Sequence, residues 1–223
     1  MLKFDTSAAI AAVLEIPSGR IQVIAADRGD ATVEIRPANA TRSRDVKAAE
    51  QTTVEYGDGV LRVKAPAEKH QFLGPSGSVE VTVQLPTGSR VEATAAAAEF
   101  RGVGRLGDVA FEGAHGTVKI DEAASARVTA HAGDITVGRL TGPAELSTQQ
   151  GDIRIAEATS GTVVLRTRMG SVTVGAAPGV SASLDAGTGY GRIHNALRNT
   201  EGAAAGLAIH ATTDHGDISA SSL

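Results

Sequence analysis

The stretch HAGDITVGRLTGPAELSTQQGDIRI, residues 131–155, contains one five-residue pattern twice, as GDITV from Gly133 and as GDIRI from Gly151. In each copy a glycine and a polar residue precede two β-branched residues that are separated by one polar residue. This spacing is typical of a turn followed by a half-buried strand. A second strand-like segment, PAELS from Pro143, lies midway between the copies. The stretch therefore predicts a repeating unit of two strands and two turns, about 18 residues long.

The same unit recurs along the second half of the sequence. Glycine-headed segments begin at Gly116, Gly133, Gly151, Gly170, Gly191 and Gly216, and the intervening segments begin at residues 108, 126, 143, 161, 180 and 206. Successive glycines lie 17, 18, 19, 21 and 25 residues apart. Like positions resemble one another when each strand stacks on its counterpart one coil away. We therefore predict an all-β fold, a right-handed parallel β-solenoid or β-helix with coils of about 18 residues.

Alternation within the strands predicts which side chains face the interior. The inward positions carry aliphatic residues: Val118, Ile120, Val128, Ile135, Val137, Leu146, Ile153, Ile155, Val163, Leu165, Val172, Val174 and Leu184. The outward positions are polar: Thr117, Lys119, Asp134, Thr136, Asp152, Arg154, Ser171, Thr173, Arg192, His194, Asp217 and Ser219. A narrow interior lined by aliphatic residues agrees with an aromatic content of only 3%.

The first part of the chain follows a different pattern. Gly19–Pro37 and Val54–Pro66 each contain two alternating segments around a turn-forming sequence, DRGD at 27–30 and GDG at 57–59, and both predict antiparallel hairpins. Residues 47–52 and 67–76 are expected to form loops, and 196–206 an Ala/Gly-rich insertion in the last coil. We predict a single domain over residues 1–223, in which an N-terminal hairpin or cap region, 1–76, precedes the solenoid repeats of 77–223.

Composition excludes several classes of protein. The 223 residues include no cysteine, which rules out disulfides and thiolate metal sites. The net charge is −4 with no basic run, which disfavours nucleic acid as a partner. No segment approaches the roughly 18 uninterrupted apolar residues that cross a bilayer, and none has the pattern of an export signal. We therefore expect a cytoplasmic protein that does not bind membranes.

The stretch GVGRLGD, residues 102–108, has the G-x-G-x-x-G spacing of a dinucleotide site. Such a site needs a buried strand before the glycines and a helix after them. The preceding AAAAEFR lacks an apolar run, and Gly113 and Gly116 interrupt any following helix. We interpret Gly107 as a turn glycine that heads a strand and Gly102 and Gly104 as part of a bend, so we expect no cofactor.

The array resembles a bacterial family of β-strand-repeat proteins of unknown function whose members carry the name "putative adhesin". The resemblance rests on the G-D-[IV]-x-[IV] units at Gly133, Gly151 and Gly216, on GSVEVTVQLPTGSRVEATAAAAEFRGVGRLGDV from Gly77, and on IPSGRIQVIA from Ile16. It covers nearly the whole chain and implies a β-helical or β-solenoid domain. It carries over no catalytic residues, because the family has none defined.

Two clusters deserve comparison with metal or catalytic sites. In a solenoid Asp134 and Asp152 would stack beside Arg154, an arrangement that suits either calcium and an acidic sugar polymer or simple turn capping by aspartate. The segment HATTDHGD collects His210, Asp214, His215 and Asp217, either as metal ligands or as a solvated turn. We favour turn capping and a solvated turn, and we expect no metal.

Catalytic residues are not predicted either. His115 and His131 precede Gly116 and Gly133 and are expected to approach each other at a coil corner, but two imidazoles without a nucleophile make no catalytic site. No G-x-S-x-G or Ser/His/Asp arrangement is present.

The sequence favours a non-catalytic scaffold or binding protein with an unknown macromolecular partner, most simply a protein. Its candidate binding face is formed by Lys119, Arg154 and His194, which would project from alternate coils with Thr136 and Thr173 between them. A flat polar ladder suits an extended partner better than a small molecule. The alternatives are a carbohydrate-active β-helix enzyme that uses Asp134 and Asp152, and a self-assembling β-helical cytoskeletal protein similar to bactofilins.

Overall fold

The computed structural model describes residues 1–66 and 77–223, most of which lie in β-strands. The chain divides into two compact units, Met1–Gly116 and Thr117–Leu223, which we call unit 1 and unit 2. The predicted all-β class is confirmed, whereas the single-domain organisation stays a prediction. The loop predicted at 67–76 lies outside the described residues.

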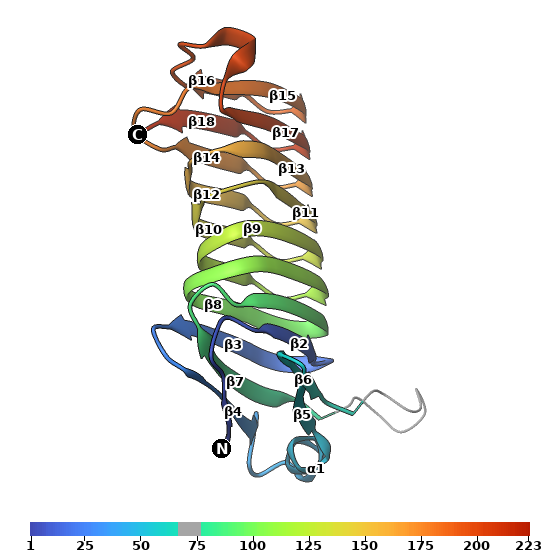
Figure 1. Ribbon diagram of the computed structural model, residues 1–223. Coiled ribbons are helices and arrows are strands. Elements are labelled where there is room, and N and C mark those ends of the chain that lie inside the picture. Colours follow the sequence, from blue (N-terminus) through green and yellow to red (C-terminus); the bar gives the residue numbers. More distant parts are fainter. Residues whose placement is uncertain (67–76) are drawn as a thin grey trace. The chain divides into compact units, whose positions relative to one another are not determined.

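Unit 1 stacks its central strands in parallel (Figure 1). Its elements are β1 (Leu2–Asp5), β2 (Ala11–Glu15), β3 (Ser18–Ala26), β4 (Asp30–Pro37), α1 (Ser43–Gln51), β5 (Thr53–Gly57), β6 (Val60–Lys64), β7 (Val79–Pro86) and β8 (Arg90–His115). Strand β2 lies between β6 and the first part of β8, and β3 lies between β7 and the second part of β8. Ile21 of β3 therefore has Val81 on one side and Phe100 on the other, and all three are buried.

Of the two predicted N-terminal hairpins, only the second forms. Strands β5 and β6 pair antiparallel across a turn in which Asp58 and Gly59 have φ values of 51° and 72°, as the favoured two-residue hairpin turn requires. The first prediction is wrong, because β3 pairs only with parallel neighbours and β4 pairs antiparallel with β7 and β1. Placing β3 between two coils buries Ile21 and Val23 completely, and a hairpin with β4 would occupy one of the edges that this packing needs.

A short helix replaces the loop that we predicted at 47–52. Helix α1 packs against β4 and β7 with Ala48 and Asp45 buried, and the Asp45 carboxylate accepts a hydrogen bond from the Ser78 N–H at 3.0 Å. The segment SRDVKAAEQ is rich in good helix formers. It has few apolar side chains, so hydrophobic periodicity gave no indication of it.

Unit 2 consists of two rows of parallel strands (Figure 1). Its elements are β9 (Val118–Ala132), β10 (Ile135–Leu140), β11 (Ala144–Gln150), β12 (Ile153–Ala158), β13 (Gly161–Met169), β14 (Val172–Ala176), β15 (Ala182–Tyr190), β16 (Ile193–Ala196), the 3₁₀ turn η1 (Gly202–Ala204), β17 (Leu207–His215) and β18 (Ile218–Ser222). Row A runs from the first part of β9 through β10, β12, β14 and β18 to β16. Row B runs from the second part of β9 through β11, β13 and β17 to β15.

The order of the last two coils differs from the order of the sequence. The coil formed by β17 and β18 lies between the β13–β14 coil and the β15–β16 coil. Residues 197–206 return the chain from β16 to β17 rather than forming an insertion within one coil. A physical reason is apolar content, since the inner coil has Leu207 and Ala220 at inward positions where the outer coil has Ala182 and Asn195.

The predicted interior of unit 2 is otherwise confirmed. Ile135, Ile153 and Val172 are in register and fully buried, and the other predicted inward residues are buried as well, apart from the half-buried Leu184. The fold is thus solenoid-like, with stacked parallel strands around an aliphatic interior. Its right-handed sense and a uniform coil of about 18 residues stay predictions.

Candidate functional site

The residues of the predicted binding face lie in one outward column of row A. We call this column the polar strand face; its members in spatial order are Lys119, Thr136, Arg154, Thr173, Ser219 and His194. Lys119 and Arg154 lie two strands apart with Thr136 between them, as predicted. The expected position of His194 is wrong by one strand, because the β17–β18 coil places Ser219 between Thr173 and His194.

The cations of the polar strand face differ from those of row B. Among the described residues, no ion pair involves Lys119 or Arg154. On row B, by contrast, Arg127 and Arg166 both pair with Glu145, at 3.8 and 3.1 Å, and His210 lies 3.3 Å from Asp185. Each of these row B side chains therefore has a carboxylate beside it, whereas Lys119 and Arg154 have none among the described residues.

The repeated aspartates act as caps between coils. The Asp134 carboxylate accepts a hydrogen bond from the Asp152 N–H at 2.9 Å, and the Asp152 carboxylate accepts one from the Ser171 N–H at 2.7 Å. Asp217 accepts a hydrogen bond from the Arg192 N–H at 2.8 Å. Each carboxylate thus satisfies a backbone donor of the next coil, which supports the interpretation of these residues as caps rather than as a calcium site.

The glycines that head the row A strands form a corner, which we call the glycine corner. Gly151 and Gly170 have φ values of 140° and 152°, and a Cβ on Gly170 would overlap the carbonyl oxygen of Gly151. The buried Thr167 hydroxyl donates a hydrogen bond to this same oxygen at 3.0 Å. Only glycine therefore allows the coils to stack this closely.

Sequence reasoning missed the threonines of this corner. Thr148, Thr167, Thr213 and Thr188 each donate a hydrogen bond to a corner glycine carbonyl, at 2.9 to 3.3 Å. Each of these threonines lies three residues before the glycine that begins a repeat, so the pattern T-x-x-G could have identified them. These hydroxyls provide hydrogen-bond donors to the carbonyl groups of the corner.

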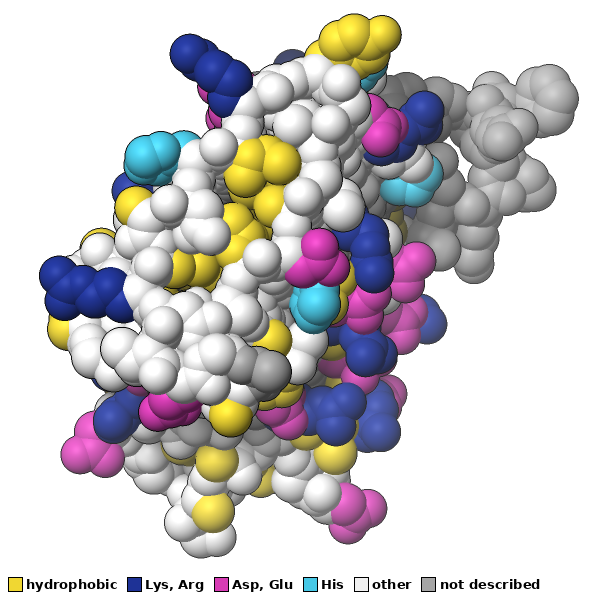
Figure 2. Space-filling view, turned by 90° about the horizontal axis from the view of Figure 1, so that it is seen from above, with side chains coloured by type: hydrophobic (Ala, Val, Ile, Leu, Met, Phe, Trp, Pro, Cys, Tyr) yellow, Lys and Arg dark blue, Asp and Glu magenta, His cyan; other side chains and the backbone are white. Residues whose placement is uncertain are grey.

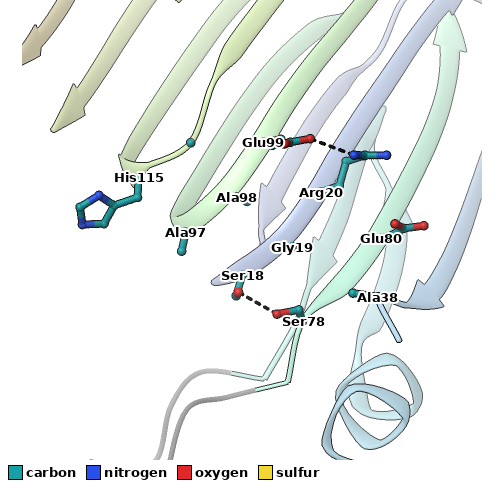
Figure 3. A pocket seen from close by; sticks show the side chains of 11 residues that line it. Ser18, Gly19, Arg20, Ala38, Ser78, Glu80, Ala97, Ala98, Glu99 and His115 are labelled. Carbon is teal, nitrogen blue, oxygen red and sulfur yellow. Dashed lines mark hydrogen bonds and ion pairs between the residues drawn. The ribbon is translucent and has the colours of Figure 1, made fainter. Parts of the chain in front are cut away.

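A shallow pocket lies at the corresponding corner of unit 1 (Figure 3). It has a volume of about 470 Å³, and its lining comes from β3, β7 and β8. The Ser18 and Ser78 hydroxyls form a hydrogen bond at 2.9 Å, and Arg20 pairs with Glu99 at 3.0 Å. The His115 ring points away from the two serines (Figure 3). This geometry offers no base to a serine nucleophile, and the pocket is best described as a shallow depression.

A smaller groove lies at the glycine corner of unit 2. We call it the corner groove; it has a volume of about 290 Å³ and is lined by Gln149, Gln150, Arg168, Met169, Asp214 and His215. Arg168 and Asp214 pair at 3.6 Å. The imidazole of His215 stacks on the ring of Tyr190, with ring centroids 5.0 Å apart and an interplanar angle of 3°.

The histidine and aspartate cluster predicted at 210–217 does not converge. His210 contacts Asp185, Asp214 contacts Arg168, His215 stacks on Tyr190, and Asp217 contacts Arg192. Within residues 1–66 and 77–223, no three His, Asp or Glu side chains are placed to hold a metal ion. His115 and His131 belong to different units, so their proximity stays a prediction.

The glycines of GVGRLGD lie within strand β8. Gly102 pairs with Val23 of β3, and Gly107 lies inside β8, so the predicted bend at Gly102 and the predicted turn at Gly107 are both wrong. Gly104 has a φ of 78° beside the Ala25 carbonyl oxygen, and no helix follows Gly107. The spacing therefore arises from close stacking of strands and not from a phosphate-binding loop.

In the part of the chain that the structure describes, neither helix has the length and apolar composition that crossing a bilayer requires.

Stacked parallel strands, an aliphatic interior and polar outward columns define a solenoid-like β-repeat protein. The chain belongs to the Toastrack DUF4097 family, which it matches over residues 11–222. The predicted resemblance to a bacterial β-repeat family of unknown function is thereby confirmed. No curated protein matches the chain.

Solved bacterial structures match the chain at low sequence identity. A "putative adhesin" from Parabacteroides distasonis is 12% identical over 98% of this chain and 95% of that chain, with a TM-score of 0.52. A "putative adhesin" from Bacteroides fragilis is 12% identical over 98% and 96% of the two chains, with a TM-score of 0.48. A "putative cell adhesion protein" from Clostridium sporogenes is 12% identical over 100% and 98%, with a TM-score of 0.40. The match to the Parabacteroides distasonis protein supports a shared fold, and none of the three matches bears on the function.

Proposed function

We propose that this protein is a non-catalytic binding protein that holds an extended protein partner on the polar strand face. The observation that carries the proposal is the pair Lys119 and Arg154, two exposed cations that are in register on one column and form no ion pair among the described residues. Unpaired cations on a rigid strand scaffold are free to pair with carboxylates of another protein.

The distance between side chains along the polar strand face determines which partners can bind to it. Adjacent strands lie about 4.8 Å apart, so Lys119 and Arg154 are separated by about 10 Å. The Thr136 and Thr173 hydroxyls flank Arg154 and can donate or accept hydrogen bonds. A partner with carboxylates at a matching spacing would find electrostatic complementarity along an extended line of contact.

A catalytic function has less support. The Asp134 and Asp152 carboxylates, on which a carbohydrate-active enzyme would depend, each accept a backbone hydrogen bond. Neither borders the pocket of unit 1 or the corner groove of unit 2. A groove beside reacting carboxylates is what such an enzyme requires.

The test is affinity capture from bacterial lysate with the wild type and the double variant Lys119→Glu/Arg154→Glu. The matched control is Arg127→Glu/Arg166→Glu, which makes the same change of charge on row B, where exposed ion pairs contribute little to stability. Circular dichroism first establishes that all three proteins are folded. We expect a partner that the wild type and the row B control recover equally and that the Lys119/Arg154 variant recovers at least about tenfold less, as a loss of about 1.4 kcal/mol implies.

Equal recovery of every partner by the wild type and the Lys119/Arg154 variant would contradict the proposal. So would a wild type that recovers no protein, because the proposal requires a partner. If the Lys119/Arg154 variant and the row B control both lost the same partner, binding would depend on overall charge and not on the polar strand face.

A further inference from the structure

The corner groove of unit 2 combines two kinds of surface. One column contains Gln150, Met169, His215 and Tyr190, which are in register on successive strands of row B. Met169 and Tyr190 are 56% and 75% exposed, although large apolar side chains are usually buried. The column thus presents a continuous, soft and partly aromatic strip at the surface.

Polar groups accompany this strip on the preceding residue of β11, β13 and β17. Gln149, Arg168 and Asp214 are all exposed. Two consecutive exposed residues occur here because the strand ends at a corner, where neither residue faces the interior. Arg168 and Asp214 lie 3.6 Å apart with about two thirds of each side chain exposed, so most of their hydrogen-bonding atoms remain accessible.

We propose that the corner groove binds a short segment of a neutral oligosaccharide. The amide of Gln149, the guanidinium of Arg168 and the carboxylate of Asp214 are planar groups that each present two donor or acceptor atoms. Adjacent hydroxyl groups on a sugar ring match such pairs of atoms. The C–H faces of the same ring are apolar and can contact Met169 and the imidazole of His215, which line the groove beside these polar groups.

The dimensions of the corner groove agree with this class of ligand. The groove spans three strands, β11, β13 and β17, and therefore extends about 10 Å along the stack, close to the length of a disaccharide. Its volume of about 290 Å³ is at the lower end of small-molecule sites. An open groove at a corner allows a longer chain to continue beyond both ends.

A peptide fits the same groove less well. Strands β13 and β17 are hydrogen-bonded on both sides, so no free strand edge is available for a peptide to add a strand. The groove is too polar to take the apolar face of a helix. A polyproline segment, which docks between aromatic rings, is the remaining peptide mode and serves as the competing probe.

The proposal is independent of the polar strand face, because the corner groove is built on row B by other residues. The wild type, Arg168→Ala/Met169→Ala and Arg127→Ala are titrated with cellohexaose, chitohexaose, maltohexaose and a proline decamer, and binding is followed by ¹H–¹⁵N NMR. Arg127 is an exposed row B arginine outside the groove and serves as the matched control. Because both altered groove residues are exposed, the variant is expected to fold, and its amide spectrum verifies this.

We expect at least one hexasaccharide to shift the amides of Gln150, Met169 and His215 in the wild type and in the control. The groove variant should bind it at least tenfold more weakly. Three outcomes would overturn the proposal: no hexasaccharide shifts these amides, the groove variant binds as tightly as the control, or only the proline decamer binds. None of these outcomes depends on whether a protein partner occupies the polar strand face.

Discussion

Each unit has one coil that is stacked out of sequence order, but the two units finish their outermost coils differently. In unit 1 the first coil, β2–β3, lies between β6–β7 and β8. In unit 2 the last coil, β17–β18, lies between β13–β14 and β15–β16. Strands β4 and β5 then cover β7 and β6 in unit 1, whereas β15 and β16 pair on one side only within the described chain.

The covering of the outer coil determines what each unit exposes. The view from above shows hydrophobic side chains among the white atoms near the centre of the face (Figure 2), and Ile193 of β16 is 46% exposed. In unit 1 the outer strands bring Phe4 against Tyr56, with ring centroids 5.3 Å apart. Parallel stacking alone therefore leaves an exposed apolar end, which antiparallel strands and α1 cover in unit 1.

The charges of the two units differ as well. In unit 1 the outward column alternates in sign through Arg36, Glu80, Arg20 and Glu99, which are in register on neighbouring strands. Cross-strand neighbours of opposite charge stabilise each other and leave little net field. The polar strand face of unit 2 contains two cations separated by threonine, which is why the binding face that we propose lies in unit 2.

The largest expected effect comes from Ile153→Asp. The new carboxylate would lie between Ile135 and Val172 in a fully buried column, and we expect a loss above about 4 kcal/mol, enough to unfold unit 2. Hydrogen exchange with mass spectrometry measures the effect in each unit, and Arg154→Ser on the exposed side of the same strand is the control. Loss of protection in unit 2 alone would contradict the single-domain prediction, and unchanged protection would show that the inward positions are misassigned.

The second prediction compares two glycines with positive φ. Gly170→Ala would place a methyl group against the Gly151 carbonyl and should cost about 3 kcal/mol, from strain and overpacking together. Gly59→Ala in the hairpin of unit 1 meets no atom within 4 Å and should cost only about 1 kcal/mol. Urea unfolding of the two variants measures both values. Equal losses would mean that backbone conformation, and not close stacking, selects glycine at the corner.

A smaller effect is expected from Thr167→Val. The substitution keeps the shape of the side chain and removes the hydrogen bond to the Gly151 carbonyl, so it should cost about 1 kcal/mol. Thr162→Val, at an exposed position on the same strand, should be nearly neutral. In unit 1, the residues three positions before Gly116 and Ala98 are Gly113 and Ala95, which carry no hydroxyl group. We therefore expect the threonine hydrogen bonds to stabilise unit 2. If Thr167→Val left the free energy of unfolding unchanged, the hydrogen bond of Thr167 would contribute nothing to the stability of unit 2.

The smallest effect concerns Asp30 of unit 1 at low pH. A hydrogen bond from Arg28, assisted by Lys3, lowers the pKa of Asp30 from 3.8 to about 2 against the opposing effect of burial. Because the folded pKa is the lower one, this stabilisation is complete above pH 3.8 and is lost as the pH falls toward 2. Asp30→Asn should flatten the dependence of unit 1 stability on pH in this window, as followed by thermal melting. An unchanged dependence would show that the ion pair with Arg28 does not form in solution.

The repeats determined the class of fold and most of the interior of unit 2. Alternation placed Ile135, Ile153 and Val172 in one buried column, because a strand with one buried face must repeat with period two. The same periodicity placed Lys119 and Arg154 outward and two strands apart, since stacked coils repeat one chemistry at each position. The glycine that begins each repeat was also predictable as a turn residue, and the aspartate that follows it at Gly133, Gly151 and Gly216 as a cap.

Only the tertiary structure decided the order of the coils, and with it several surface features. Periodicity identifies strands but not their neighbours, so it could not show that β17–β18 lies inside β15–β16 or that β3 pairs away from β4. His194 moved by one strand for this reason, and Tyr190 came to stack on His215. The corner groove likewise joins residues up to 66 positions apart, Gln149 and His215. Such contacts depend on which apolar strands are buried most completely, a property of the whole packed unit and not of any local pattern.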